Sequence, residues 1–233
     1  MSTVSKSWIE DLPRDRLIGE FSVWSADLMR LSDDLARVDP YVDILHIDVA
    51  DGHFAPAMLF FPDLVAGVRK VSAQPIHVHL MTADSILLSQ IDQFADAGAD
   101  LISIHLENER VAVEALDRLD QRGIAAGMVL KVDTPVETIG TYLPRLSFVT
   151  LLGTAIGVKG QGLNENAGHR LAEAKGLIAK ADTPRRIVLA ADGGIREHTV
   201  PLLRQSGAET VVLGSLAFNA PSLEERMTWL RAL

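Results

Sequence analysis

The feature that most constrains the fold of this chain is a regular alternation of short apolar runs with longer segments of helical period. Eight runs have the length and apolar character of β-strands, and most are separated by amphipathic segments with apolar residues three and four positions apart. The predicted strands are residues 20–24, 42–49, 75–80, 101–105, 125–130, 147–152, 186–190 and 210–213. The clearest predicted helices are residues 28–38, 63–71, 86–97, 111–121 and 171–180.

This alternation predicts parallel strands joined by right-handed crossovers, with helices covering their outer face. Eight such units in 233 residues favour a single α/β domain of the (β/α)8 or TIM-barrel type, although a doubly wound open sheet would show a similar pattern. No linker rich in glycine, serine or proline divides the chain, so we expect one catalytic barrel at residues 19–233. We expect residues 1–18 to form an arm or a short helix, with Trp8 packed on the barrel or on a neighbouring subunit.

Composition argues against several classes of function. The 31 acidic and 22 basic residues give a formal net charge of −9, which argues against nucleic acid or an acidic membrane surface as the main partner. The chain has no cysteine, which excludes disulfides, thiolate metal sites and cysteine nucleophiles. No segment has the apolar core of a signal peptide or the length of a membrane-spanning helix, so we expect a soluble cytoplasmic protein.

Polar residues gather near the ends of the predicted strands, where (β/α)8 barrels carry their active sites. His46 and Asp48 are two positions apart and therefore share one face of a strand. His79 lies near the end of the next strand, and Asp192 follows a later one, just before two glycines. Together these two imidazoles and two carboxylates suit a divalent Fe, Mn, Co or Zn ion. A His46–Asp48 hydrogen bond and an ordinary Asp-Gly turn are the alternative interpretations.

Other residues near these strand ends suggest a substrate pocket. His77 is best explained as an interior histidine with satisfied hydrogen bonds or as a turn residue, and Met81 as an apolar wall. Glycine-bearing loops at residues 153–162 and 214–218 suit a phosphate group, because free backbone N–H groups attract anions. Lys159 or Arg196 would add positive charge there. Flexible connectors are the alternative for either loop, and neither has a nucleotide-binding fingerprint.

Five segments, taken together, resemble the ribulose-phosphate 3-epimerase family. They occur in order between about residues 21 and 218, and they are SVWSAD at 22–27, HIDVADGHF at 46–54, HLM at 79–81, DGGI at 192–195 and GS at 214–215. The resemblance implies a ribulose-phosphate-binding barrel that epimerises a ketose phosphate at C3 and uses one divalent metal ion. It also implies a homo-oligomer, either a dimer or a hexamer, whose ligand is a small phosphorylated ketose.

The same resemblance assigns roles residue by residue. Asp48 and Asp192 would be the acid/base pair that moves a proton between two faces of the substrate through an enediolate. The metal ligands would be His46, Asp48, His79 and Asp192. The substrate-binding residues would be Ser22, His79, Met81, Gly157, Val158, Lys159, Gly160, Gly193, Gly194, Gly214 and Ser215.

The residues that would line the substrate differ from the family pattern. Ala50 and Leu152 stand where methionines are expected, and the loop at 155–161 lacks Asn-Pro and carries Lys159. D-ribulose 5-phosphate and D-xylulose 5-phosphate are the default substrate pair, and a hexulose 6-phosphate or a tetrulose phosphate is the alternative. A sugar-phosphate lyase is less favoured because no lysine follows Asp48 in an Asp-x-Lys pattern. A non-catalytic sugar-phosphate binder would not need two opposed carboxylates.

Overall fold

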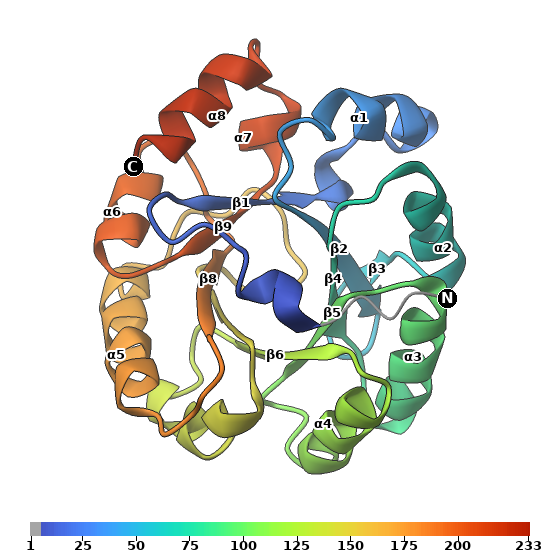
Figure 1. The fold of residues 1–233 in the computed structure, drawn as a ribbon, viewed down its shortest axis with the longest axis vertical. Helices are drawn as coiled ribbons and strands as arrows, with labels where there is room; N and C mark the ends of the chain where they lie inside the picture. Colours follow the sequence, from blue (N-terminus) through green and yellow to red (C-terminus); the bar gives the residue numbers. More distant parts are fainter. Residues whose placement is uncertain (1–5) are drawn as a thin grey trace.

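The computed structural model describes residues 6–233, which form a closed barrel of parallel strands (Figure 1). Closure comes from β1 (Ile18–Ser22), which pairs in parallel with both β2 (Ile44–Asp51) and β9 (Thr210–Leu213). This pairing confirms the (β/α)8 barrel and rules out the open sheet. The other barrel strands are β4 (Ile76–Met81), β5 (Leu101–His105), β6 (Ala125–Leu130), β7 (Phe148–Leu152) and β8 (Val188–Asp192). A two-residue strand, β3 (Met58–Leu59), pairs antiparallel with the end of β2.

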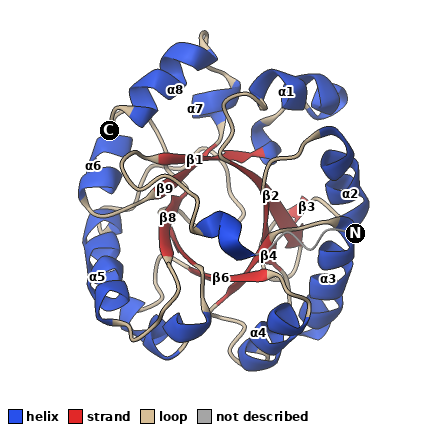
Figure 2. Cartoon of the chain, in the orientation of Figure 1, coloured by secondary structure: helices blue, strands red, loops and turns tan. Residues whose placement is uncertain are grey.

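Helices form a ring around the outside of the barrel (Figure 2). The α-helices are α1 (Leu31–Val38), α2 (Pro62–Val71), α3 (Asp84–Ala97), α4 (Ala112–Gln121), α5 (Ala167–Lys180), α6 (Val200–Gln205), α7 (Ser215–Phe218) and α8 (Leu223–Arg231). Short 3-10 helices are η1 (Lys6–Ile9), η2 (Val23–Ser25), η3 (Leu28–Arg30), η4 (Val136–Thr141) and η5 (Leu143–Arg145). Within residues 6–233, none of the helices combines the length and apolar character needed to cross a lipid bilayer.

Several element boundaries differ from the prediction by a few residues. The first strand was expected at residues 20–24, but it ends at Ser22, which pairs with His46, and Trp24 lies in η2. The helix expected at 28–38 starts as η3, because the Asp27 side chain accepts a hydrogen bond from Met29 N, and becomes α-helical at Leu31. The strand expected at 186–190 is shifted to Val188–Asp192, so that Arg186 lies before it.

The described part of the N-terminal arm closes the barrel at the end where the strands begin. The arm residues Trp8, Ile9 and Leu12 pack against an apolar cluster that includes the first residues of six strands. The Trp8 ring centroid lies 6.5 Å from that of Phe148, so Trp8 packs on the barrel as predicted. In Figure 1 the blue N-terminal helix lies across the middle of the strand ring. Residues 1–5 of the predicted arm lie outside the described residues.

A buried arginine holds this arm in place. Arg186 donates from Nη1 to Ile9 O and Leu12 O, and from Nη2 to Pro13 O and to the Glu209 carboxylate, over distances of 2.6 to 3.2 Å. These bonds give the backbone carbonyl groups of the arm a charged donor near the interior. The strand beginnings are therefore sealed by the arm, and the opposite end of the barrel carries the predicted site.

Candidate active site

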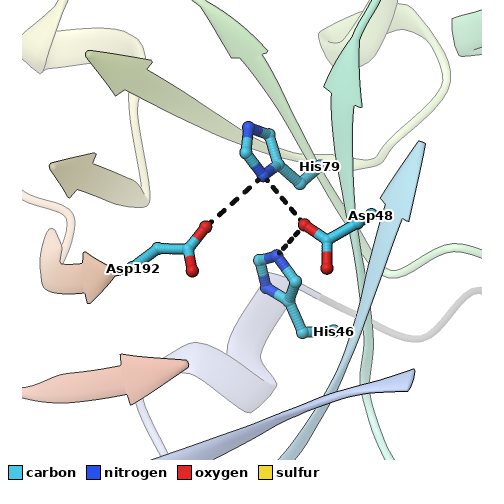
Figure 3. A group of neighbouring side chains, drawn as sticks. All are labelled: His46, Asp48, His79 and Asp192. Atoms are coloured by element: carbon cyan, nitrogen blue, oxygen red, sulfur yellow. Dashed lines mark hydrogen bonds and ion pairs between the residues drawn. The ribbon is translucent and has the colours of Figure 1, made fainter. Parts of the chain in front are cut away.

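The four predicted metal ligands converge at the ends of β2, β4 and β8 (Figure 3). Parallel pairing places Asp48 on β2 directly beside His79 on β4. The Asp48 Oδ1 atom lies 3.2 Å from His46 Nε2 and 3.3 Å from His79 Nδ1. His79 Nδ1 also lies 3.7 Å from Asp192 Oδ2. Each of the four residues offers one ligand atom, and these atoms all lie within 4.8 Å of one another.

The donor set fits a divalent metal ion. His79 Nδ1 is buried and makes no hydrogen bond to the described residues, although two carboxylates lie nearby. A buried polar atom without a partner is costly, and an imidazole lone pair facing carboxylates is a typical metal-binding arrangement. Nitrogen and oxygen ligands without sulfur match the preferences of first-row divalent ions. This cluster of side chains can therefore hold a divalent ion.

The two carboxylates of the cluster have pKa values displaced in opposite directions. Burial alone raises the pKa of Asp48, but the charge of His46 and its hydrogen bond lower this pKa far below its ordinary value. Burial, together with the negative charge of Asp48, raises the pKa of Asp192 to about 6. At neutral pH Asp48 is thus held as a carboxylate, whereas Asp192 takes up a proton more readily. Such a divergent pair is suited to acid–base chemistry.

The side chain of Ser22, at the end of β1, is part of the cluster. Its hydroxyl donates to Asp48 Oδ2 over 2.8 Å, and parallel pairing sets Ser22 beside His46. The two oxygens of Asp48 therefore have separate contacts, Oδ1 near the two histidines and Oδ2 on the Ser22 hydroxyl. The carboxylate is held in one orientation.

Glu20 supports the cluster from below, and the sequence prediction did not include it. This fully buried carboxylate accepts from His46 Nδ1 over 3.0 Å, from His77 Nδ1 over 2.6 Å and from the Thr210 hydroxyl over 3.2 Å. Burial raises the pKa of Glu20, but His77 and His46 lower it well below its ordinary value. The available signal was a glutamate in an apolar strand, two positions from Ser22 and so on the same face.

The surroundings of the two lower histidines differ. His77 is an interior histidine with both nitrogens bonded, to Glu20 and to the Ser103 hydroxyl over 2.6 Å, which confirms its predicted role. Burial lowers the pKa of His77. Burial also opposes the charged form of His46, but Asp48 and Glu20 raise the pKa of His46 well above its ordinary value. Without a metal ion, His46 is therefore an imidazolium between two carboxylates.

A second pair that the sequence prediction omitted lies beside His79. His105, at the end of β5, places its Nε2 atom 2.8 Å from His79 Nε2 and its Nδ1 atom 2.9 Å from Glu107 Oε2. His105 is fully buried. The signal in the sequence was again spacing, because His105 and Glu107 are two positions apart at a strand end.

A cavity of about 370 Å³ opens in front of the cluster. Its lining includes Asp48, His79 and Asp192 from the cluster, whereas His46 is fully buried behind them. Met81 lines the cavity and packs with Ala50 and Ala55 as an apolar wall. The structure places every predicted substrate-binding residue on this lining, namely Ser22, His79, Met81, Gly157, Val158, Lys159, Gly160, Gly193, Gly194, Gly214 and Ser215.

Two glycines bring backbone close to the cavity directly after β8. Gly193 and Gly194 have φ values of 86° and 72°, which L-residues with a side chain rarely adopt. A Cβ atom at Gly193 would lie 2.3 Å from Thr154 Oγ1, and one at Gly194 would lie 2.8 Å from Leu163 Cα. Glycine is therefore required at both positions for this loop to lie against its neighbour.

Lys159 spans the mouth of the cavity. Its Nζ atom donates to Trp24 O over 2.6 Å and lies 4.5 Å from the Trp24 ring centroid, so the loop after β7 contacts the segment after β1. Burial lowers the pKa of Lys159, and the charge of Asp48 opposes this effect. Arg196 also lines the cavity, but one of its nitrogens donates to the backbone at Ile195 O.

Comparison with known proteins assigns the chain to a family. A sequence model described as the "Ribulose-phosphate 3 epimerase family" matches residues 19–218. The chain is 30% identical over 213 residues to a ribulose-phosphate 3-epimerase of Chlamydia pneumoniae, covering 90% of this chain and 92% of the relative. It is 31% identical over 211 residues to one of Bacillus subtilis (strain 168), covering 90% and 96%.

Solved structures with low sequence identity share the barrel fold. A mutant tryptophan synthase alpha-subunit from Pyrococcus furiosus aligns with a TM-score of 0.66 at 19% identity, over 93% of this chain and 97% of that chain. Orotidine 5'-phosphate decarboxylase from Pyrococcus horikoshii OT3 aligns with a TM-score of 0.64 at 14% identity, over 91% and 97%. These likenesses support the fold alone.

Proposed function

The chain belongs to the ribulose-phosphate 3-epimerase family, and on that premise we propose that it interconverts D-ribulose 5-phosphate and D-xylulose 5-phosphate by inversion at C3. The chain is thus a carbohydrate-phosphate epimerase, an isomerase. The observation that carries the proposal is that two carboxylates, Asp48 and Asp192, line one cavity beside the same imidazole, that of His79. Inversion at carbon needs two such groups, one to remove a proton from one face and one to supply a proton to the other.

The residues proposed to hold a divalent metal ion are His46, Asp48, His79 and Asp192. Zn²⁺, Fe²⁺, Mn²⁺ and Co²⁺ all match these nitrogen and oxygen donors. When bound, the ion supplies Lewis-acid stabilisation for the negative charge that develops on the substrate oxygens. This help is required because a hydrogen next to a ketone is only weakly acidic at neutral pH.

The proton transfers are assigned to the two aspartates. In one direction Asp48, held as a carboxylate, removes the C3 proton, and Asp192 delivers a proton to the opposite face of C3. In the reverse direction the two residues exchange roles. The bond from the Ser22 hydroxyl to Asp48 Oδ2 keeps that carboxylate from rotating as it loses or gains the proton.

We assign the phosphate group to the glycine-bearing loops that line the cavity. Backbone N–H groups around Gly193, Gly194 and Gly214 would hold the dianion, as helix and loop N–H groups do in many phosphate sites. Lys159 would contribute a positive charge in a chain whose net charge is −9. Met81 would contact the carbon chain of the sugar as the apolar wall.

The same proposal includes a cytoplasmic homo-oligomer, either a dimer or a hexamer. It is consistent with exposed apolar side chains at Met29, Met58 and Phe61, which are 92%, 84% and 59% exposed in the single chain. Sedimentation equilibrium of the purified protein tests it, and a monomer at micromolar concentration would contradict it.

The reaction is tested by solvent deuterium uptake at C3, followed by NMR, in metal-reconstituted protein. The substrate panel contains tetrulose, pentulose and hexulose phosphates. We expect uptake with appearance of the epimer, fastest on the pentulose 5-phosphate, and none with the Asp48→Asn variant. Faster epimerisation of a tetrulose or hexulose phosphate would replace the proposed substrate. Absence of exchange on the whole panel by metal-loaded protein would refute the proposed reaction.

A further inference from the structure

Residues outside the cavity determine which ring nitrogen of His79 donates a hydrogen bond. The Nδ1 atom of His79 faces Asp48 and Asp192 (Figure 3). Its Nε2 atom lies 2.8 Å from His105 Nε2. Two imidazole nitrogens at this distance can form a hydrogen bond only when one carries a proton and the other a lone pair. Both side chains are buried, with 1% of His79 and none of His105 exposed. Water is therefore a poor substitute for either partner.

Glu107 decides which nitrogen donates. Its Oε2 atom lies 2.9 Å from His105 Nδ1, and an ionised carboxylate can only accept, so His105 Nδ1 carries the proton. A neutral imidazole ring holds one proton, so the proton on His105 Nδ1 leaves a lone pair on its Nε2 atom. His79 Nε2–H must then donate to His105. The remaining nitrogen, His79 Nδ1, is left with a lone pair that faces the two aspartates, in agreement with its lack of any hydrogen-bond partner among the described residues.

The Glu107 carboxylate is itself held by backbone and side-chain donors. Its Oε1 atom accepts from Lys131 N over 3.0 Å and from the Thr134 hydroxyl. Burial raises the pKa of Glu107, but the bonds from His105, Thr134 and Lys131 N lower it to about 2. Glu107 is therefore ionised at neutral pH. The Glu107 Oε2 atom accepts from His105, and Oε1 accepts from Lys131 N and the Thr134 hydroxyl.

We infer that Glu107 and His105 are positioning residues that fix the tautomer of His79 and so reserve its Nδ1 atom for the divalent ion. The inference rests on the metal site of the proposed function. Neither side chain is among the described residues that line the cavity, so both act through His79 and not on substrate. His46 is oriented by the same principle through one bond, since Glu20 accepts from its Nδ1 and leaves Nε2 toward Asp48. Such outer partners typically change metal affinity 10–100-fold when they are altered.

The informative variant is Glu107→Gln, which keeps the shape of the side chain. It exchanges donor and acceptor in the hydrogen bonds that run from residue 107 through His105 to His79. Lys131 N–H and the Thr134 hydroxyl require an acceptor, so the glutamine oxygen faces them and its NH₂ group faces His105 Nδ1. His105 must then accept at Nδ1 and donate from Nε2 to His79. The proton of His79 moves to Nδ1, which is no longer a ligand.

Two measurements test the inference on full-length protein. Competition with a chelator gives the Zn²⁺ affinity, which should fall about 10–100-fold in Glu107→Gln. Imidazole ¹⁵N shifts of metal-free protein should show the proton on His79 Nε2 in the wild type and on Nδ1 in the variant. The matched control is Thr134→Val, which removes one donor to Glu107 and leaves the carboxylate. It should keep the wild-type tautomer and a Zn²⁺ affinity within about twofold of wild type, because the bond from His105 remains.

The possible failures are distinguishable. If wild type binds Zn²⁺ and Glu107→Gln binds it equally well, the positioning inference is wrong and the proposed function stands. If wild type binds no Zn²⁺, the proposed metal site is wrong and the inference fails with it. A wild-type spectrum with the proton on His79 Nδ1 overturns the inference even if the variant does not fold.

Discussion

Replacing Asp192 by asparagine should stabilise the metal-free protein while removing its activity. The side chain of Asp192 forms no hydrogen bond with the described residues, and its one charged contact is the 3.7 Å approach to His79 Nδ1. Asparagine is nearly the same size, so little packing or hydrogen bonding is lost. What is lost is a negative charge that burial and Asp48 both disfavour.

The size of the effect follows from the pKa of Asp192. Its value in the folded protein is about 6, against an ordinary value of 3.8, and this difference corresponds to roughly 3 kcal/mol at 25 °C. A carboxyl group whose pKa is raised by folding contributes stability below its unfolded pKa and loses it as the pH rises through its folded pKa. The variant should therefore be more stable than wild type by about 3 kcal/mol at pH 8, and the gain should vanish near pH 4.

Urea unfolding of chelator-treated protein measures the difference in stability between variant and wild type at pH 8 and at pH 4. The slope and midpoint of each transition give the free energy of unfolding. Adding Zn²⁺ supplies an internal control. An ion present at a thousand times its dissociation constant stabilises wild type by about 4 kcal/mol, and the variant, with one ligand weakened, gains less. The advantage of the variant over wild type should then become smaller. A variant that is no more stable than wild type at pH 8 without metal would refute the electrostatic reasoning.

Two further predictions concern the cavity and the metal. Lys159→Ala should raise KM for the phosphorylated ketose about tenfold with little change in kcat, because a charged contact to the phosphate is worth about 1.4 kcal/mol or more. Steady-state kinetics measure both constants, and an unchanged KM would show that Lys159 does not contact the substrate. Zn²⁺ binding at pH 7 should release about one proton, because Asp48 and Glu20 raise the pKa of His46 well above its ordinary value and the ring must lose its Nε2 proton to ligate. Calorimetry in two buffers of different ionisation enthalpy counts this proton, and equal heats would contradict the prediction.

The barrel and the convergence of the cluster could be predicted from sequence because both follow from short-range patterns. Strand-like runs and helical segments alternate, and the carboxyl ends of parallel strands meet at one end of a barrel. His46, Asp48, His79 and Asp192 lie at such ends and were predicted to share a site. The spacing also predicted that His77 would be an interior histidine. The helix α6 was missed because six residues are too few to establish a period.

The supporting groups could not be predicted because they depend on the stagger between strands. His79 pairs in register with Ser103, yet its imidazole contacts His105, two residues farther along β5. Glu20 and His77 are 57 residues apart and come from strands that do not pair directly. Parity indicates that Glu20 faces the interior side of β1, but it does not indicate which histidines Glu20 will meet. Glu107 lies in the turn after β5, where strand parity gives no direction.

The arm that seals the barrel sets the order in which a newly made chain can finish folding. Arg186 binds the carbonyl groups of Ile9, Leu12 and Pro13, which lie 173 to 177 residues earlier, and β1 has β9 as one of its two neighbours. Contacts so distant in sequence form slowly and late. On the ribosome, residues 8–22 must wait for most of the chain to be synthesised before they acquire these partners. This segment is synthesised long before its partners and is therefore among the last to be fixed in place, so its apolar side chains need protection until residues 186–213 are made.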